Sequence, residues 1–138
     1  MHMMSFATLD LMCMPRFSTR ELGKLREVVW HAACMGRIGN LVSTWRREIG
    51  ECDFNSGVFA RAVNHGDLTI EQLAQPDVDQ IEAAIIHGGH EEYFLHRWNH
   101  HRELLQAKAA GVRSIDLREF STDQERFFHM HMGSRGLI

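Results

Sequence analysis

The sequence predicts an all-α protein, a single helical bundle that takes in the whole of residues 1–138. Pro15 and Pro76 are the only prolines, so long stretches of chain lie free of the residue that most often breaks helices. Helix-start patterns recur along the chain, and no stretch alternates apolar and polar residues as a half-buried strand does. With 44% hydrophobic residues, the chain can bury a substantial core.

The first half of the chain is predicted to contain two helices. An apolar helix over residues 3–12 begins without a capping residue, and Pro15 ends it. An apolar helix that begins at the first residues without a cap is unusual, so we expect this sequence to be a piece cut from a longer chain. Ser18-Thr19-Arg20-Glu21 has the pattern of a capping box and predicts a long helix from Ser18 to Ile49, with Gly50 as the residue that ends it.

The second half is predicted to contain a series of shorter helices. Residues 50–57 have the composition of a loop, and a short helix follows over Val58–Asn64. Thr69-Ile70-Glu71-Gln72 is a second capping box, and Pro76 stops the helix that it opens. A helical segment from Asp77 to about Ala110 should kink or break at Gly88-Gly89, since each glycine costs about 1 kcal/mol relative to alanine. A last helix is expected from Ser121 or Thr122 to Met132, and residues 133–138 form a tail.

Composition narrows the class of protein. The net charge of −3 argues against a general nucleic-acid binder, but the stretch from Arg16 to Arg47 holds seven Lys or Arg and two Glu, which suits an anionic ligand. The three cysteines lack metal-type spacing and predict reduced thiols in a cytoplasmic protein. No run of 18 apolar residues predicts a membrane span, and the N-terminus does not resemble a signal peptide.

The most informative pattern lies in residues 37–48, where oxygen-bearing side chains recur every four residues. Asn40, Thr44 and Glu48 therefore stack along one face of the predicted helix. An amide, a hydroxyl and a carboxylate oxygen are ligands that Mg²⁺ accepts. One carboxylate cannot neutralise a divalent cation, so an anion such as diphosphate would complete the site, held by Arg37 and Arg47. Taken alone, this spacing also fits a solvated helix face.

The same stretch, Arg37-Ile38-Gly39-Asn40-Leu41-Val42-Ser43-Thr44-Trp45-Arg46-Arg47-Glu48, resembles the second metal-binding motif of class I terpene synthases. The family pattern is N/D-D-L/I/V-x-S/T-x-x-R/K-E. The positions that match are Asn40, Val42, Thr44, Arg47 and Glu48. Leu41 departs from it, because the family usually has a second acid there. The resemblance covers roughly residues 3–65 and includes the acidic, asparagine-containing loop that follows the motif.

The resemblance implies a helical bundle like part of the class I isoprenoid synthase fold, and Mg²⁺-dependent ionisation and cyclisation of an isoprenyl diphosphate. Asn40, Thr44 and Glu48 would hold Mg²⁺, or Mn²⁺ in its place. Arg47, supported by Arg37, would contact the diphosphate and act in catalysis. Arg135 would be a further diphosphate contact, although the tyrosine that normally follows is missing. The aromatic side chains that could face a carbocation are Trp30, Phe6, Phe94 and Trp98, for each of which ordinary core packing is the competing interpretation.

One part of the family's apparatus is absent from the sequence. The aspartate-rich first metal motif does not occur, and Asp10 stands alone. The resemblance therefore implies that residues 1–138 are the C-terminal half of a larger terpene synthase domain. Such a fragment should be inactive by itself, and its main partner would be the N-terminal portion that carries the aspartate-rich motif.

Two other functions remain open from the sequence. His87, His90, His96, His100 and His101 crowd one predicted helical segment, which would suit a helical protein that binds a metal or haem through residues 87–101. His90-Glu91-Glu92-Tyr93-Phe94 is not an H-E-x-x-H motif, because its fifth residue is phenylalanine. The other alternative is a non-catalytic helical module that forms a homodimer through its apolar surface.

Overall fold

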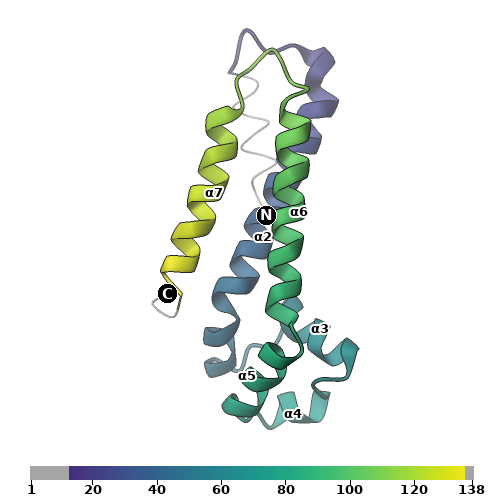
Figure 1. Cartoon of the computed structure of the whole chain (residues 1–138), viewed down its shortest axis with the longest axis vertical. Coiled ribbons are helices and arrows are strands. Elements are labelled where there is room, and N and C mark those ends of the chain that lie inside the picture. The colour runs from purple at the N-terminus through teal and green to yellow at the C-terminus, as the bar shows by residue number, and fades with distance from the viewer. Residues whose placement is uncertain (1–12, 136–138) are drawn as a thin grey trace. The chain divides into compact units, whose positions relative to one another are not determined.

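The computed structural model describes residues 13–135, and this part of the chain is all-helical, as predicted (Figure 1). The elements in chain order are η1 (Thr19–Glu21), α2 (Leu22–Gly50), α3 (Gly57–His65), α4 (Ile70–Ala74), α5 (Val78–His87), α6 (His90–Ala109) and α7 (Arg118–Gly133). None of the described helices has the length and apolar character needed to cross a membrane. The predicted helix over residues 3–12, with Phe6 and Asp10, and the last three residues of the predicted tail lie outside the described part.

The chain packs as two compact units. Within the described residues, unit 1 consists of 13–37 and 98–129, and unit 2 consists of 38–97 and 130–135. The helices α2, α6 and α7 each contribute residues to both units. The predicted metal-binding face of α2 belongs to unit 2.

The core of unit 1 is built from α2 and α6. On α2, residues at helical spacing are buried: Leu25, Val28, Val29, Ala32, Ala33 and Met35. On α6, Trp98 and Leu105 are buried, and the Trp98 ring stacks on Phe128 of α7 with 4.1 Å between ring centroids. An aromatic stack of this kind joins α7 to α6 by more than apolar burial alone.

The start of the long helix differs from the prediction. Ser18 makes no side-chain capping bond, and residues 19–21 form a 3₁₀ turn before α2 begins at Leu22. The Glu21 carboxylate instead accepts hydrogen bonds from the backbone N–H groups of Arg113 and Ser114 and from the Ser114 hydroxyl, at 2.7–3.1 Å. These hydrogen bonds lower the pKa of Glu21. The capping-box interpretation was therefore wrong, because a loop distant in sequence offers Glu21 more donors than its own helix does.

The start of α7 also lies earlier than predicted. The helix begins at Arg118, and Ser121 is inside it, with its hydroxyl donating to the Leu117 carbonyl one turn back. Asp116 accepts from the Arg118 backbone N–H at 3.0 Å and from its guanidinium, which lowers the pKa of Asp116 to about 2. The side chain that binds a backbone N–H at the start of this helix is therefore that of Asp116, five residues before the predicted start at Ser121.

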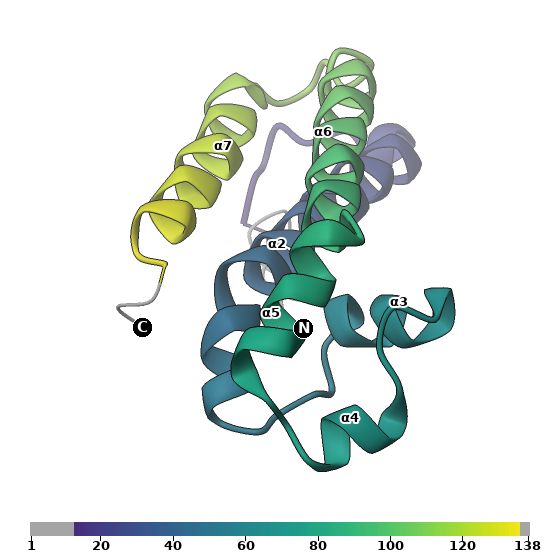
Figure 2. The same ribbon diagram turned by 60° about the horizontal axis from the view of Figure 1, so that its bottom comes forward.

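Unit 2 has its own core, made where α2 meets the short helices α3, α4 and α5 (Figure 2). The buried residues of this core are Trp45, Ile49, Val58, Phe59, Ala62, Leu68, Ile81 and Ile85. An apolar stripe runs along α2, in which Ile38, Val42, Trp45 and Ile49 are buried and Cys34 and Leu41 are half-buried. The predicted capping box at Thr69 and Gln72 is formed, and Asp77 caps α5.

The C-terminus of α2 is closed by a cysteine rather than by the predicted glycine. Gly50 is the last helical residue, and the left-handed residue is Cys52, with φ of 54°. The Asp53 N–H donates to the Glu48 carbonyl and the Cys52 N–H to the Ile49 carbonyl, the two bonds of a Schellman motif. This closure holds the Glu48 backbone in place at the end of the predicted metal-binding face.

The break expected at Gly88-Gly89 is confirmed. It separates α5 from α6, and Gly89 has a positive φ of 62°. A Cβ at Gly88 would lie 2.4 Å from Nε2 of His90, so the imidazole packs directly against the glycine. His90 is fully buried, and its Nε2 lies 2.9 Å from the Asp67 carboxylate. Burial lowers the pKa of His90, although Asp67 opposes the shift.

Because His90 is buried, we expect the folded chain to lose stability in acid. An unfolded chain takes up the histidine proton near the ordinary pKa of 6.5, whereas the folded chain takes it up only at lower pH. The contribution of His90 to the free energy of unfolding is therefore fully present above about pH 6.5, and it is lost as the pH falls below that value. Urea unfolding at a series of pH values should show this slope, and His90→Asn should reduce it. The exposed His96, replaced in the same way, is the control, and equal slopes in both variants would contradict the assignment.

Candidate functional site

The candidate site is the face of α2 that carries Asn40, Thr44 and Glu48. The Thr44 hydroxyl lies 2.6 Å from Glu48 Oε1 and 2.8 Å from the Asn40 backbone carbonyl. A hydroxyl has a single hydrogen, so it donates to one of these oxygens at a time and keeps its lone pairs for another partner. The four-residue spacing therefore brings a hydroxyl and a carboxylate together on consecutive turns of α2.

Glu48 carries an unusual oxygen. Its Oε2 atom is buried and has no hydrogen-bond partner among the described residues, whereas Oε1 is bonded to Thr44. A buried carboxylate oxygen without a donor is costly, because it has given up water and received nothing in exchange. Such an atom is a site where a cation or a proton donor would be stabilised.

A cavity of about 210 Å³ lies beside this face. It is lined by Asn40, Ser43, Thr44 and Arg47 from α2 and by His131 and Ser134 from the C-terminal part of unit 2. Glu48 does not line the cavity and adjoins it through the Thr44 hydroxyl. The cavity thus combines amide, hydroxyl, imidazole and guanidinium groups, a set suited to a small anion with its counter-cation.

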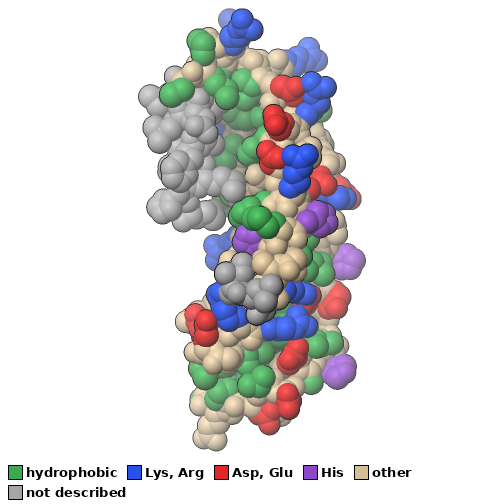
Figure 3. Space-filling model, turned by 90° about the vertical axis from the view of Figure 1, so that its left-hand side faces the viewer, with side chains coloured by type: hydrophobic (Ala, Val, Ile, Leu, Met, Phe, Trp, Pro, Cys, Tyr) green, Lys and Arg blue, Asp and Glu red, His purple; other side chains and the backbone are tan. Residues whose placement is uncertain are grey.

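Arg47 supplies the positive charge at the cavity. Its guanidinium is 43% exposed and pairs with Glu51 one turn on, with 3.3 Å between Nε and Oε1. An exposed i,i+4 pair of this kind contributes only a few tenths of a kcal/mol, so Arg47 can exchange Glu51 for an anion at small cost. Acidic, basic and histidine side chains are interspersed on the face shown in Figure 3.

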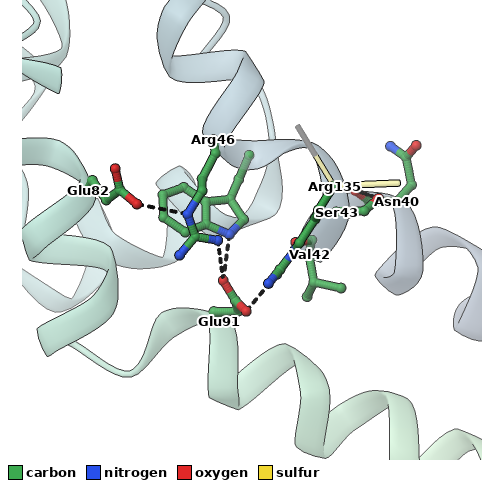
Figure 4. Close-up of polar contacts among 8 residues, drawn as sticks. Asn40, Val42, Ser43, Arg46, Glu82, Glu91 and Arg135 are labelled. Carbon is green, nitrogen blue, oxygen red and sulfur yellow. Dashed lines mark hydrogen bonds and ion pairs between the residues drawn. The ribbon is translucent and has the colours of Figure 1, made fainter. Parts of the chain in front are cut away.

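Arg135 is held by the protein itself. Its guanidinium donates to Glu91 at 2.6 Å and to the Val42 carbonyl, at 3.0 Å from Nε (Figure 4). The same Glu91 carboxylate accepts from Trp45 Nε1 at 2.8 Å and from Arg46 at 3.2 Å. The predicted diphosphate contact therefore has an internal counter-ion in Glu91, which offsets the charge of its guanidinium.

The other predicted site residues have different surroundings. Trp30 and Arg37 belong to unit 1 and are exposed, with Trp30 at 52%. Phe94 is half-buried against the unit 2 core, and Trp98 is buried in unit 1. These last two side chains are occupied by core packing, which is the competing interpretation that the sequence allowed.

The histidines do not gather into one site. Across residues 13–135, no three His, Cys, Asp or Glu residues converge in a way that could hold a metal ion. His90 pairs with Asp67 in unit 2, whereas His101 lies against His31 of α2 in unit 1. His87, His96 and His100 are exposed. The sequence pattern of residues 87–101 did not reveal either pairing, because the partners lie 23 and 70 residues away.

Comparison with known proteins adds no relative: no family model, curated protein or solved structure matches this chain.

Proposed function

We propose that this chain is the C-terminal part of a class I terpene synthase, and that the α2 face binds a divalent metal together with the diphosphate of an isoprenyl substrate. The observation that carries the proposal is the buried, unpartnered Oε2 of Glu48 beside the Thr44 hydroxyl. It supports a cation as the missing partner, because carboxylate and hydroxyl oxygens are ligands that Mg²⁺ prefers.

The donor set fits Mg²⁺ or Mn²⁺ in chemistry, with Asn40, Thr44 and Glu48 as its holders. Thr44 keeps lone pairs free for a metal while its hydrogen points to a neighbouring oxygen. One carboxylate leaves a divalent ion with net positive charge, so the pair of metal and diphosphate should bind much better than the metal alone. When bound, the metal would stabilise the negative charge that develops on the leaving diphosphate.

Arg47 is the residue that we assign to the diphosphate. It lines the same cavity as Asn40 and Thr44, and its present partner Glu51 is 55% exposed. In the proposed reaction the allylic carbon–oxygen bond breaks, and the bonding electrons leave with diphosphate. Arg47 would donate charge-assisted hydrogen bonds to that group, and these bonds strengthen as its charge grows.

Binding of metal and diphosphate can be tested on this chain by NMR. Mn²⁺ added together with diphosphate should broaden the amide signals around Asn40, Thr44 and Glu48, and Mn²⁺ alone should broaden them much less. Glu48→Gln should remove the selective broadening, because a neutral amide binds hard cations poorly. Glu51→Gln is the matched control one turn away and should keep it, since Arg47 is then released for the anion. Uniform or absent broadening in the unmodified chain would overturn the proposal.

A further inference from the structure

Two histidines from distant parts of the chain face each other in unit 1. His31 lies on α2 and His101 on α6, and their Nδ1 atoms are 3.0 Å apart. The ring centroids are 5.3 Å apart, and the ring planes are tilted by 42°. At this distance one Nδ1 donates a hydrogen to the other, which requires the two neutral rings to be in different tautomers.

Burial favours the neutral form of the His31 ring. His101 is buried and His31 is half-buried, and burial is the main cause that lowers the pKa of His31. Lys108 and His100 lower it further and Glu27 raises it, while Glu27 and Lys108 form their own ion pair at 2.5 Å. A neutral imidazole has a lone pair on one nitrogen, which is the form that coordinates metal ions.

We propose that His31 and His101 form a two-histidine site for a divalent transition-metal ion such as Zn²⁺, which bridges α2 and α6 inside unit 1. Metal–nitrogen bonds of 2.0–2.1 Å to two nitrogens 3.0 Å apart give a nitrogen–metal–nitrogen angle of about 95°. This angle lies between square-planar and tetrahedral values, so small movements of the half-buried His31 suffice for either geometry.

Metal binding at this pair conserves its hydrogens. The ring that donates from Nδ1 changes to the tautomer with hydrogen on Nε2, and both Nδ1 lone pairs then point to the metal. Among the described residues, no third His, Cys, Asp or Glu joins the pair, so these two nitrogens are the ligands that the proposal assigns to the ion. The site does not depend on the proposed synthase function, since Mg²⁺ prefers oxygen ligands and Zn²⁺ accepts nitrogen.

Thermal unfolding of the tag-free chain tests this site. Zn²⁺ should raise the unfolding temperature at neutral pH, because it binds the paired rings of the folded chain more tightly than the separated histidines and thiols of the unfolded chain. Mg²⁺ should leave it unchanged. His31→Ala should lower the apparent Zn²⁺ affinity about tenfold or more, whereas the exposed His96→Ala on α6 should leave it as in the unmodified chain.

A spectroscopic measurement covers the case in which a variant is poorly folded. Cu²⁺ bound to the unmodified chain at one equivalent should show electron paramagnetic resonance couplings to two imidazole nitrogens, and His31→Ala should show fewer. The proposal is overturned if Zn²⁺ does not stabilise the unmodified chain. It is also overturned if His31→Ala and His96→Ala respond equally to the metal, because the ion then binds elsewhere among the ten histidines.

Discussion

Glu91→Ala is expected to lower the free energy of unfolding by about 3–5 kcal/mol, the usual cost of removing one partner from a largely buried charge pair. The Glu91 side chain is 13% exposed and that of Arg135 is 26% exposed. Alanine would leave the Arg135 guanidinium with no carboxylate, and it would leave the indole N–H of the fully buried Trp45 with no acceptor (Figure 4). Denaturant unfolding measures the loss.

One further variant separates charge from hydrogen bonding at Glu91, and a second, at the neighbouring residue, serves as the control. Glu91→Gln keeps an oxygen for the Trp45 N–H but removes the charge opposite Arg135, so it should lose about 1–3 kcal/mol. Glu92→Ala removes the exposed neighbour on the same helix and should change stability by less than about 0.5 kcal/mol. If Glu91→Ala were as stable as Glu92→Ala, the Glu91 network would not hold unit 2 together.

Glu48→Gln is expected to reduce diphosphate release at least about 10²-fold in a synthase that joins these residues to an aspartate-rich motif. Glutamine keeps the size of the side chain and an oxygen near Thr44, but it removes the only carboxylate on the face formed by Asn40, Thr44 and Glu48. The metal would then bind weakly, and the leaving diphosphate would lose most of its charge stabilisation. Released diphosphate measured against Mg²⁺ concentration tests this.

The control for Glu48 is Glu51→Gln, which changes an exposed carboxylate one turn further on and should retain turnover within a few-fold. The 138-residue chain alone should show no turnover, since one carboxylate cannot assemble the metal centre. Unchanged turnover in Glu48→Gln would rule out the assigned role of this face. Cyclisation by the isolated chain would instead contradict its assignment as half of a synthase.

Much of the helical layout was predictable, because local residues decide where a helix starts and stops. Pro76, the Thr69 capping box and the Gly88-Gly89 break act on their own turn of chain, and each was found as predicted. Predictions failed where a distant group competed for the same side chain. Glu21 bonds to the 113–114 loop instead of capping its own helix. The prediction for the end of α2 failed for another reason, because Cys52 adopts the left-handed conformation that glycine usually adopts.

Part of the candidate site was likewise predictable from the sequence, and part of it required the tertiary structure. The line of Asn40, Thr44 and Glu48 follows from four-residue spacing on any helix, so the sequence alone determined it. Its surroundings required tertiary structure, since the unpartnered oxygen of Glu48 and the cavity shared with Ser134 depend on which segments pack nearby. Spacing along a helix is a local property, whereas burial and long-range partners arise only when distant segments meet.

The Glu91–Arg135 and His31–His101 pairs could not have been inferred from the sequence. Glu91 meets Arg135 across 44 residues, and His31 meets His101 across 70. Nothing in the neighbourhood of either residue marks its partner, because many carboxylates and histidines along α6 have the same local pattern. The sequence by itself determined an all-helical chain in which Asn40, Thr44 and Glu48 lie along one face of α2. Tertiary packing decided which arginine is held by the protein and which histidines are brought together.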